Sequence, residues 1–365
     1  MKKVLILLLV SALMLGMFAG CASQSNGTTP SASPTAQGST GTQPAASETP
    51  KATEPAPTDK PIVLKLGTNA AATDPETNFS YRVAELVLEK SNGAIKIDVY
   101  DSAQLGDHTE RLEGLRMGTI DMTQVSLDYL AAYIPVMALF GGPYLFVDEK
   151  HQNRAYNNGE LKNVIEGLIE PEGFVLVQPM ELGARHITNN TRPIKTLADL
   201  KGLKIRVPDT KASIDTLTYL GAAPTPLAFS ELYMALSQKV VDGQENPLST
   251  ASHAKLFEVQ KYLSLTGHQR LEQVLLFSKM NWDKLSDNQK NIIFESCKTA
   301  NDELIAYFTE SNAELISEFE AAGVLVNEVD DINEFIKAVE PFRADYIAKF
   351  GDTAKQIYDL IDAAK

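Results

Sequence analysis

Polar side chains suited to binding a small anion stand at or near the ends of several predicted strands. They are Asn69, the 104–108 turn that ends in His108, Ser126, Arg185, Arg206 and Asn246. In open α/β sheets, ligands bind beyond the carboxyl ends of the strands, at a switch point or between two domains. Residues far apart in the sequence can therefore meet at one site, and these residue types indicate the binding of a polar, anionic molecule.

Arg206 carries the strongest chemical signal in this set. It stands in the otherwise apolar strand 204–207 and is followed directly by Pro208 and Asp209. Its guanidinium offers five donors in a fixed arrangement, which suits bidentate binding of a carboxylate. From the residues alone three interpretations stay open: a ligand contact, a structural salt bridge, or an exposed position on an edge strand.

No residue pattern indicates catalysis or a bound metal. The chain has two cysteines outside any CxxC, and its five histidines lack a metal-ligand spacing such as HExxH. No GxSxG elbow accompanies Ser126. The pairs Asp107/Asp121 and Glu110/Glu113 resemble glycosidase carboxylates, but helix capping and solvated faces explain them better. We therefore predict no catalytic residue, no metal and no cofactor.

The composition is that of an acidic globular protein. Of the 365 residues, 44% are hydrophobic and 22% are charged, and 33 Lys and Arg oppose 47 Asp and Glu, for a formal net charge of −14. Such an acidic balance repels phosphate backbones, and no Lys/Arg cluster with interleaved aromatic residues occurs. Nucleic acid is therefore not expected as a partner. The length allows about two domains.

The start of the chain has the pattern of an export signal followed by a tether. Residues 1–20 combine a basic start, an apolar run and small residues, which predicts a signal peptide. The small residues directly before Cys21 resemble the bacterial lipobox, with Phe18 where Leu is usual, and predict that Cys21 is lipidated. Residues 22–60 contain no Val, Ile, Leu, Met or aromatic residue. We therefore expect segment 21–60 to be a lipidated, disordered tether that holds the folded part beside a membrane.

From residue 61 onward the hydrophobic pattern alternates between strands and helices. Strands are predicted at 62–66, 95–99, 120–122, 174–177, 183–188 and 204–207. Helices are predicted around 81–88, around 112–117 with Asp107 as the cap, at 196–200, at 213–220, at 230–236 with Ser230 as the cap, and over the long stretch 286–322. This rhythm indicates parallel strands with helical crossovers, and so an α/β fold.

Seven stretches of the sequence resemble one protein family. They are QLG at 104–106, GTIDM at 118–122, LKGLKIRVP at 200–208, LGAAPTP at 220–226, ELYMAL at 231–236, VDGQENP at 241–247 and LTGH at 265–268. Together they make the chain similar to the solute-binding proteins of TRAP transporters, the tripartite ATP-independent periplasmic transporters, in their dicarboxylate- and sialic-acid-binding (DctP-type) form. The resemblance extends from Ile62 to about Asp287.

The resemblance implies a monomer with a periplasmic-binding-protein-like fold. Two α/β lobes, each a mixed, mostly parallel sheet flanked by helices, would close like a clamp, with a long helix spanning both lobes. Lobe I is expected at 61–182 plus 272–311 and lobe II at 183–271 plus 312–365. The hinge strands are expected near 181–184 and 271–274. The clamp would capture a small organic acid and deliver it to the small and large membrane subunits of an ion-driven transporter.

The resemblance also assigns roles to individual residues. Arg206 would pair with the carboxylate of the ligand, and Arg185 would contribute to the same site. Asn246 would form a hydrogen bond with the ligand, Asn69 would lie at the end of the first strand, and Phe229 would pack against the ligand. The membrane contact would be made only through the lipid on Cys21.

Two departures from the sialic-acid-binding pattern bear on the ligand. Ser126 and Tyr129 stand where those binders have a glutamate and a nearby arginine, and Asp209 replaces an asparagine. An ionised Asp209 beside the site would favour hydroxyl groups over a second carboxylate, so a uronate or an aldonate is predicted. A dicarboxylate is the second choice, because Arg185 and Arg206 could each bind one end.

Two other function classes stay open. A lipoprotein that feeds an ATP-driven importer is the nearer one, and a neighbouring gene for an ATPase would indicate it. A surface-tethered enzyme or carbohydrate-binding module is the more distant one, because no catalytic pattern is present. At the site itself, His108 is either a cleft residue or a helix-start or surface histidine.

Overall fold

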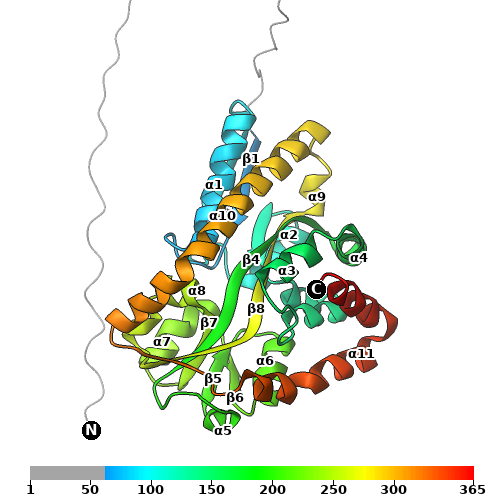
Figure 1. Cartoon of the computed structure of the whole chain (residues 1–365). Helices are drawn as coiled ribbons and strands as arrows, with labels where there is room; N and C mark the ends of the chain where they lie inside the picture. The colour runs from blue at the N-terminus through cyan, green and yellow to red at the C-terminus, as the bar shows by residue number, and fades with distance from the viewer. Residues whose placement is uncertain (1–61) are drawn as a thin grey trace, which may run out of the picture. The chain divides into compact units, whose positions relative to one another are not determined.

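The computed structural model describes residues 62–365, whose strands pair into one mixed nine-stranded sheet (Figure 1). The strands are β1 (Ile62–Gly67), β2 (Ile95–Tyr100), β3 (Met122–Val125), β4 (Phe174–Asn189), β5 (Lys204–Val207), β6 (Ala223–Pro226), β7 (Gly243–Pro247), β8 (Tyr262–Ser278) and β9 (Leu325–Glu328). Their order across the sheet is β2-β1-β3-β8-β4-β7-β5-β6, and β9 pairs with β8.

Helices connect and cover these strands. The α-helices are α1 (Pro75–Lys90), α2 (His108–Arg116), α3 (Glu149–Tyr156), α4 (Gly159–Ile169), α5 (Leu197–Leu200), α6 (Lys211–Tyr219), α7 (Leu232–Ser237), α8 (Leu248–His253), α9 (Lys279–Trp282), α10 (Asp287–Ala321) and α11 (Ile332–Asp362). Short 3₁₀ helices are η1 (Leu127–Ala132), η2 (Pro135–Gly141), η3 (Glu170–Glu172), η4 (Phe229–Glu231) and η5 (Leu256–Glu258).

Parallel strands joined by helices occupy both ends of the sheet. Strand β1 pairs in parallel with β2 and β3, and β5 pairs in parallel with β6 and β7. Because such strands need crossover connections, helices α1 and α2 follow the first two strands, and α6 and α7 lie between β5 and β7. We call the part around β1–β3 the first lobe and the part around β5–β7 the second lobe. The predicted two-lobed α/β fold is confirmed, and the sheets of the two lobes are continuous.

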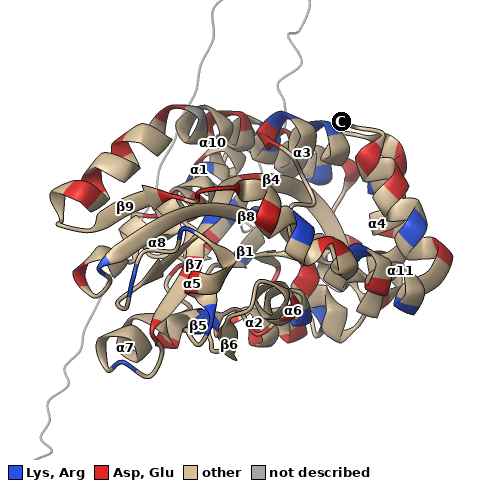
Figure 2. Ribbon diagram, turned by 60° about the horizontal axis from the view of Figure 1, so that its bottom comes forward, with Lys and Arg blue, Asp and Glu red and all other residues tan. Residues whose placement is uncertain are grey.

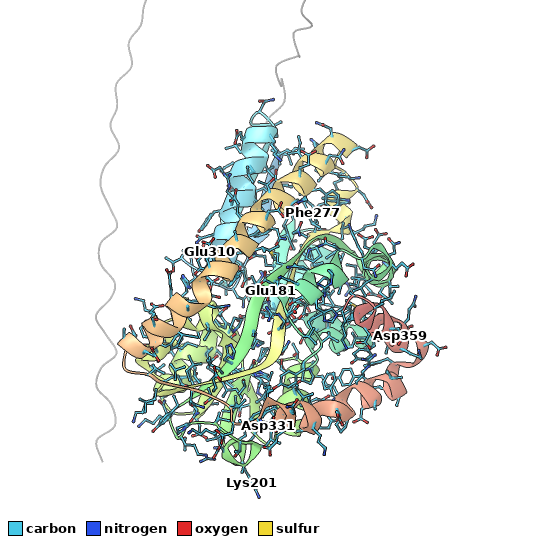
Figure 3. All side chains as sticks on the ribbon, viewed as in Figure 1. Glu181, Lys201, Phe277, Glu310, Asp331 and Asp359 are labelled. Atoms are coloured by element: carbon cyan, nitrogen blue, oxygen red, sulfur yellow. The ribbon has the colours of Figure 1, made fainter. Side chains whose placement is uncertain are left out.

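Two long antiparallel strands, β4 and β8, join the lobes. Strand β8 pairs with β3 of the first lobe, and β4 pairs with β7 of the second (Figure 1). Strand β4 corrects the prediction of separate strands at 174–177 and 183–188. Gly183, which looks like a break, has φ of 93° within a register shift between Glu181 and Ala184, so that the strand bends there without ending. Figure 3 labels Glu181 in the middle of β4 and Phe277 near the end of β8.

The longest helix within residues 62–365 is α10, which matches the helix predicted over 286–322. Ser286 and Gln289 form a capping box at its start. Its first half buries Ile293 in the hydrophobic core of the first lobe, beside α1, and its second half buries Phe319 in a core of the second lobe (Figure 1). The expectation of a helix that spans both lobes is therefore confirmed.

The residue boundaries of the two lobes stay a prediction. Helix α11 contributes to two cores: Phe335 packs with Ile205 of β5, and Phe342 packs in the cluster that contains Leu112 and Phe174. A non-helical Gly351 interrupts this helix. The same helix therefore contacts elements on both sides of the expected boundary.

Asp and Glu residues are spread over the helices that cover the sheet (Figure 2). No helix within residues 62–365 combines the length and the apolar character that a membrane span requires. The predicted signal peptide, the lipidation of Cys21 and the tether lie outside the described residues.

Candidate ligand-binding site

A cavity lies where the two lobes meet, and most of the ligand-binding residues predicted from the sequence line it. These are Asn69, His108, Ser126, Arg185, Arg206, Phe229 and Asn246. The remaining lining residues are Ala70, Glu76, Asp128, Tyr129, Pro208, Ser213, Thr250, Gln269, Leu271 and Gln273. Asn69 follows β1, Ser126 follows β3, and Arg206 lies near the end of β5. The strand ends of both lobes therefore converge as α/β topology requires.

Asp209 is exposed and does not line the cavity, which corrects its predicted role. Pro208 still lines the cavity, but Thr210 is already the N-cap of α6, where its side chain accepts a hydrogen bond from the backbone N–H of Ser213 at 3.3 Å. The turn between these two residues points Asp209 outward. Asp209 therefore does not contribute the expected preference for ligand hydroxyl groups at this site.

Arg206 is a buried cation without a carboxylate partner. Its side chain is 1% exposed, and Nε and Nη2 donate to the carbonyl oxygen of Leu227 at 3.0 and 2.6 Å. The guanidinium carbon lies 6.0 Å from the centre of the Phe229 ring. No ion pair within residues 62–365 includes Arg206, and burial lowers its pKa. A buried guanidinium that lines a cavity without a carboxylate partner has the charge and the donors that suit an anion.

Arg185 differs from Arg206 because a protein carboxylate already neutralises it. Its guanidinium donates to the carboxylate of Glu245, and Nη2 also donates to Asn246 Oδ1 at 3.1 Å. His268 Nε2 lies 3.3 Å from the same carboxylate. Burial opposes the ionisation of Glu245, but Arg185 and His268 outweigh it and lower its pKa to about 2. Arg185 therefore orients Asn246, and its charge is not free for a second ligand carboxylate.

The sequence does not predict Arg111, a third buried arginine that supports the first-lobe side of the cavity. It donates to Asn69 Oδ1, to Thr123 Oγ1 at 2.7 Å, and to the carbonyl of Gln124 at 3.1 Å. Its position four residues before Leu115, a core residue of α2, is the one signal that could have placed it on the buried face.

His108 is both a helix-start residue and a cleft residue, the two positions that the sequence leaves open. It begins α2, and it also lines the cavity, with its ring centre 4.2 Å from that of Tyr129. Nη2 of Arg111 lies 3.1 Å from Nδ1 of His108. Burial, assisted by the charges of Arg111 and Arg206, lowers the pKa of His108 well below its ordinary value. The imidazole is therefore neutral and accepts a hydrogen bond through Nδ1.

Hydrogen-bonding groups without positive charge make up much of the remaining lining. Burial raises the pKa of Asp128, and burial together with Asp74 raises the pKa of Glu76 to about 7. Ser213 and Thr250 add hydroxyl groups, and several amides complete the set. One free guanidinium among many donors and acceptors suits a molecule with one carboxylate and several hydroxyl groups.

Comparison with known proteins gives one consistent family. Residues 66–349 match the family model described as bacterial extracellular solute-binding protein, family 7. The chain is 34% identical over 288 residues to the sialic acid-binding periplasmic protein of Vibrio cholerae. The aligned region covers 79% of this chain and 89% of that protein.

Solved structures are similar over nearly their whole length. The sugar acid-binding protein of Advenella mimigardefordensis in complex with galactonate has a TM-score of 0.80 and 30% identity, covering 84% of this chain and 99% of that one. A TRAP periplasmic solute-binding protein of Polaromonas bound to D-erythronate has a TM-score of 0.77 and 31% identity, covering 81% and 98%.

Proposed function

The chain belongs to family 7 of the bacterial extracellular solute-binding proteins, the solute-binding proteins of TRAP transporters, and on this premise we propose that it captures a sugar acid and delivers it to an ion-coupled TRAP membrane transporter. The observation that carries the proposal is the buried guanidinium of Arg206, which lines the cavity between the lobes without a carboxylate partner. Proteins of this family bind solutes for transporters, so the ligand is held unchanged and released.

A sugar acid suits the cavity better than a dicarboxylate. Arg206 provides one site for a carboxylate, whereas Arg185 is already bound to Glu245. Asn69, Asn246 and Ser213 line the same cavity, and their amide and hydroxyl groups would bind the hydroxyl groups of the ligand. Two similar structures hold galactonate and D-erythronate, which each combine one carboxylate with a chain of hydroxyl groups. We therefore favour an aldonate or a uronate and keep a dicarboxylate as the second choice.

The setting of this activity follows from the first part of the chain. We propose that Cys21 carries a lipid and that segment 21–60 tethers a monomeric clamp to the outer side of a cell membrane. The clamp is then restricted to the neighbourhood of its membrane subunits while its two lobes remain in water. The folded part would contact the membrane only through this anchor and through the transporter.

Isothermal titration calorimetry with the purified protein tests the ligand class. D-Galactonate, D-erythronate, D-glucuronate, succinate and N-acetylneuraminate are titrated, and the neutral galactitol serves as the matched control for D-galactonate. We expect at least one aldonate or uronate to bind and galactitol to fail, because galactitol lacks the carboxylate that Arg206 would hold. Binding of galactitol as tight as that of D-galactonate, or failure of every acid, would contradict the proposal.

A further inference from the structure

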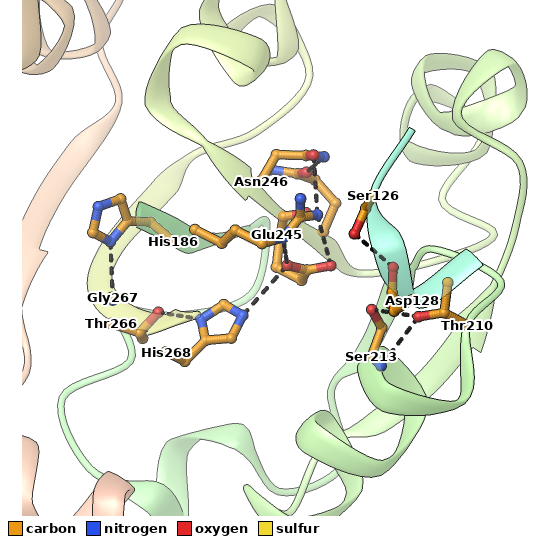
Figure 4. A network of polar contacts seen from close by, with 12 residues as sticks. Ser126, Asp128, His186, Thr210, Ser213, Glu245, Asn246, Thr266, Gly267 and His268 are labelled. Atoms are coloured by element: carbon orange, nitrogen blue, oxygen red, sulfur yellow. Dashed lines mark hydrogen bonds and ion pairs between the residues drawn. The ribbon is translucent and has the colours of Figure 1, made fainter. Parts of the chain in front are cut away.

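Two buried carboxyl groups contact a single hydroxyl at the edge of the cavity. Ser126 Oγ lies 2.6 Å from Asp128 Oδ1, a contact visible in Figure 4, and 2.8 Å from Glu272 Oε1. Asp128 is 4% exposed and Glu272 is fully buried. Ser126 and Asp128 line the cavity, and Glu272 stands in β8 between the lining residues Leu271 and Gln273.

The number of protons available decides how these contacts form. A serine hydroxyl carries one hydrogen and therefore donates to one carboxylate oxygen only. The second short contact is a hydrogen bond only when the other carboxyl is protonated and donates to Oγ of Ser126. Two ionised groups would instead bring two negative charges to one oxygen out of contact with water. We propose that Asp128 and Glu272 share one proton at neutral pH across Ser126, and that this proton strengthens the binding of an anionic ligand.

The neighbours of the pair supply no free cation that would stabilise a second negative charge. Facing it from the packed elements are Arg185 of β4, Glu245 of β7, Tyr156 of α3, Tyr346 of α11, and the hydroxyl of Thr210 before α6. Arg185 is already paired with Glu245. The second oxygen of Glu272, Oε2, is buried without a hydrogen-bond partner within residues 62–365. A neutral carboxyl tolerates that position far better than an ionised one.

Burial raises the pKa of both members of the pair. The pKa of Glu272 lies well above its ordinary value because of burial first and the nearby charge of Asp128 second, although hydrogen bonds from Ser126 and from the backbone of Leu127 and of Glu272 itself oppose the shift. The pKa of Asp128 is raised by burial, although Ser126, Thr210 and Arg185 oppose the shift. Both raised pKa values agree with a proton that stays on the pair. The two short contacts of the Ser126 hydroxyl, which has only one hydrogen, require the same proton.

Closure of the lobes links this proton to the ligand. Asp128 belongs to the first lobe, whereas Thr210, which hydrogen-bonds to it, belongs to the second. Opening the cavity gives Asp128 access to water, which lowers its pKa, and a bound carboxylate adds negative charge, which raises it. The closed, liganded state therefore holds the proton more tightly than the open state. Affinity is expected to weaken as pH rises, by at most tenfold per pH unit; this second part rests on the proposed function.

Infrared spectroscopy of the ligand-free protein at neutral pH tests the proton itself. We expect an absorption band of a protonated carboxyl group that weakens in Glu272→Gln and in Asp128→Asn, since each variant removes one carboxyl and the need to share a proton. Glu89→Gln, on the exposed face of α1, is the matched control and should keep the band. Glu76, whose pKa is about 7, contributes to the same band, so the comparison rests on band intensity. An intensity that is undiminished in both cavity variants, or the absence of the band in the wild type, would overturn the proposal. If one variant does not fold, the other decides.

Calorimetry with D-galactonate tests the link to binding. Titrations in phosphate and in Tris, whose ionisation enthalpies differ, measure the protons taken up per ligand. At neutral pH, where the ligand-free pair already holds its proton, we expect little uptake in the wild type. As the pH is raised and the ligand-free pair loses this proton, uptake should rise toward one proton in the wild type and stay clearly smaller in Glu272→Gln. An unchanged uptake in Glu272→Gln that disappears in Glu76→Gln would assign the proton to Glu76 and overturn the proposal. If no sugar acid binds, the proposed function fails, while the infrared result still decides whether the pair holds a proton.

Discussion

The carboxylate of Asp107 accepts a hydrogen bond from the hydroxyl of Ser230 at 2.7 Å, although 123 residues separate them. Asp107 lies between β2 and α2 in the first lobe, and Ser230 lies in η4 of the second. The other carboxylate oxygen of Asp107 accepts a hydrogen bond from the side chain of Asn69, which lines the cavity. One carboxylate therefore connects a cavity residue to the opposite lobe, and we expect this contact to break when the lobes separate.

Removal of this contact is predicted to speed the release of ligand. Ser230→Ala deletes the donor and leaves Asp107 exposed to water, so the closed state loses one hydrogen bond to a charged group. Because this contact is exposed and water replaces the lost hydroxyl, the net loss is about 0.5–1.5 kcal/mol, less than for a buried hydrogen bond to a charge, or roughly two- to twelvefold in the dissociation constant. Stopped-flow measurement of the dissociation rate checks this, with Ser237→Ala at the exposed end of α7 as the control. Equal dissociation rates in both variants would contradict a role of Ser230 in closure.

The hydrogen-bond partners of Asp107 and Ser230 cannot be predicted from the local sequence. The sequence predicts both as helix caps, because Asp and Ser before an apolar-periodic stretch are common N-caps. In the structure Asp107 is an N-cap without a side-chain cap hydrogen bond, and Ser230 lies inside η4. Each side chain bonds to a partner that is distant in sequence and therefore invisible to a local rule.

Periodicity is informative where an element is regular, and less so where strands bend. Strands β1 and β2 and helix α10 lie where the hydrophobic pattern predicts them, because one buried face produces a local repeat. Of strand β8, the sequence predicts only the hinge segment 271–274, since burial on both faces leaves no alternation from which the rest of the strand could be recognised. At the site, Arg206 stands out as a charge within an apolar strand, whereas Arg111 lies among charged residues of α2 and resembles a solvent-exposed residue.

Ligand binding is predicted to make the protein more compact. The strands β4 and β8 connect the lobes, and the register shift between Glu181 and Ala184 lies in one of the predicted hinge segments. Small-angle scattering should therefore give a smaller radius of gyration with saturating D-galactonate than without it. Galactitol at the same concentration is the control and should leave the radius unchanged. An identical radius with a sugar acid that binds in calorimetry would indicate a rigid pocket.

Lipidation is predicted to depend on Cys21. Cys21→Ser should abolish incorporation of radiolabelled fatty acid, because the thiol that would carry the lipid is absent. It should also release the protein from the membrane fraction or leave its signal peptide uncleaved. Cys297→Ala is the matched control, since Cys297 is buried in the first-lobe core and should not be acylated. Labelling of Cys21→Ser at the wild-type level would refute the anchor.

Arg206 is predicted to dominate affinity for the carboxylate of the ligand. Truncation of one partner of a buried charge pair costs about 2–5 kcal/mol, which weakens binding roughly 30- to several thousand-fold. Arg206→Lys keeps the charge but loses the planar fork, so its affinity should lie between wild type and Arg206→Ala.

Calorimetry at a temperature where the variants remain folded separates this role from a structural one. Arg206 also donates to the carbonyl of Leu227, so Arg206→Ala is expected to lower the melting temperature as well. Arg82→Ala, on the exposed face of α1, removes ion pairs to Glu85 and Glu303 and should leave affinity unchanged. If Arg206→Ala binds within about threefold of wild type, Arg206 does not hold the ligand.

Glu76 is predicted to make the folded protein less stable as pH rises. Burial and the neighbouring Asp74 raise the pKa of Glu76 from 4.5 to about 7, so the folded state binds more protons than the unfolded state between these values. The free energy of unfolding therefore falls by on the order of 3 kcal/mol for this group as pH increases through this interval, and it levels off above the interval.

Glu76→Gln retains an acceptor for the hydroxyl of Thr68, which lies 3.1 Å from Glu76 Oε1, but it cannot ionise. Chemical denaturation from pH 4 to pH 8 should thus show that Glu76→Gln gains stability over wild type progressively with pH. Glu89→Gln, exposed on the same helix, should follow the wild-type curve. A difference between Glu76→Gln and wild type that stays constant across this range would show that Glu76 titrates alike in the folded and unfolded states.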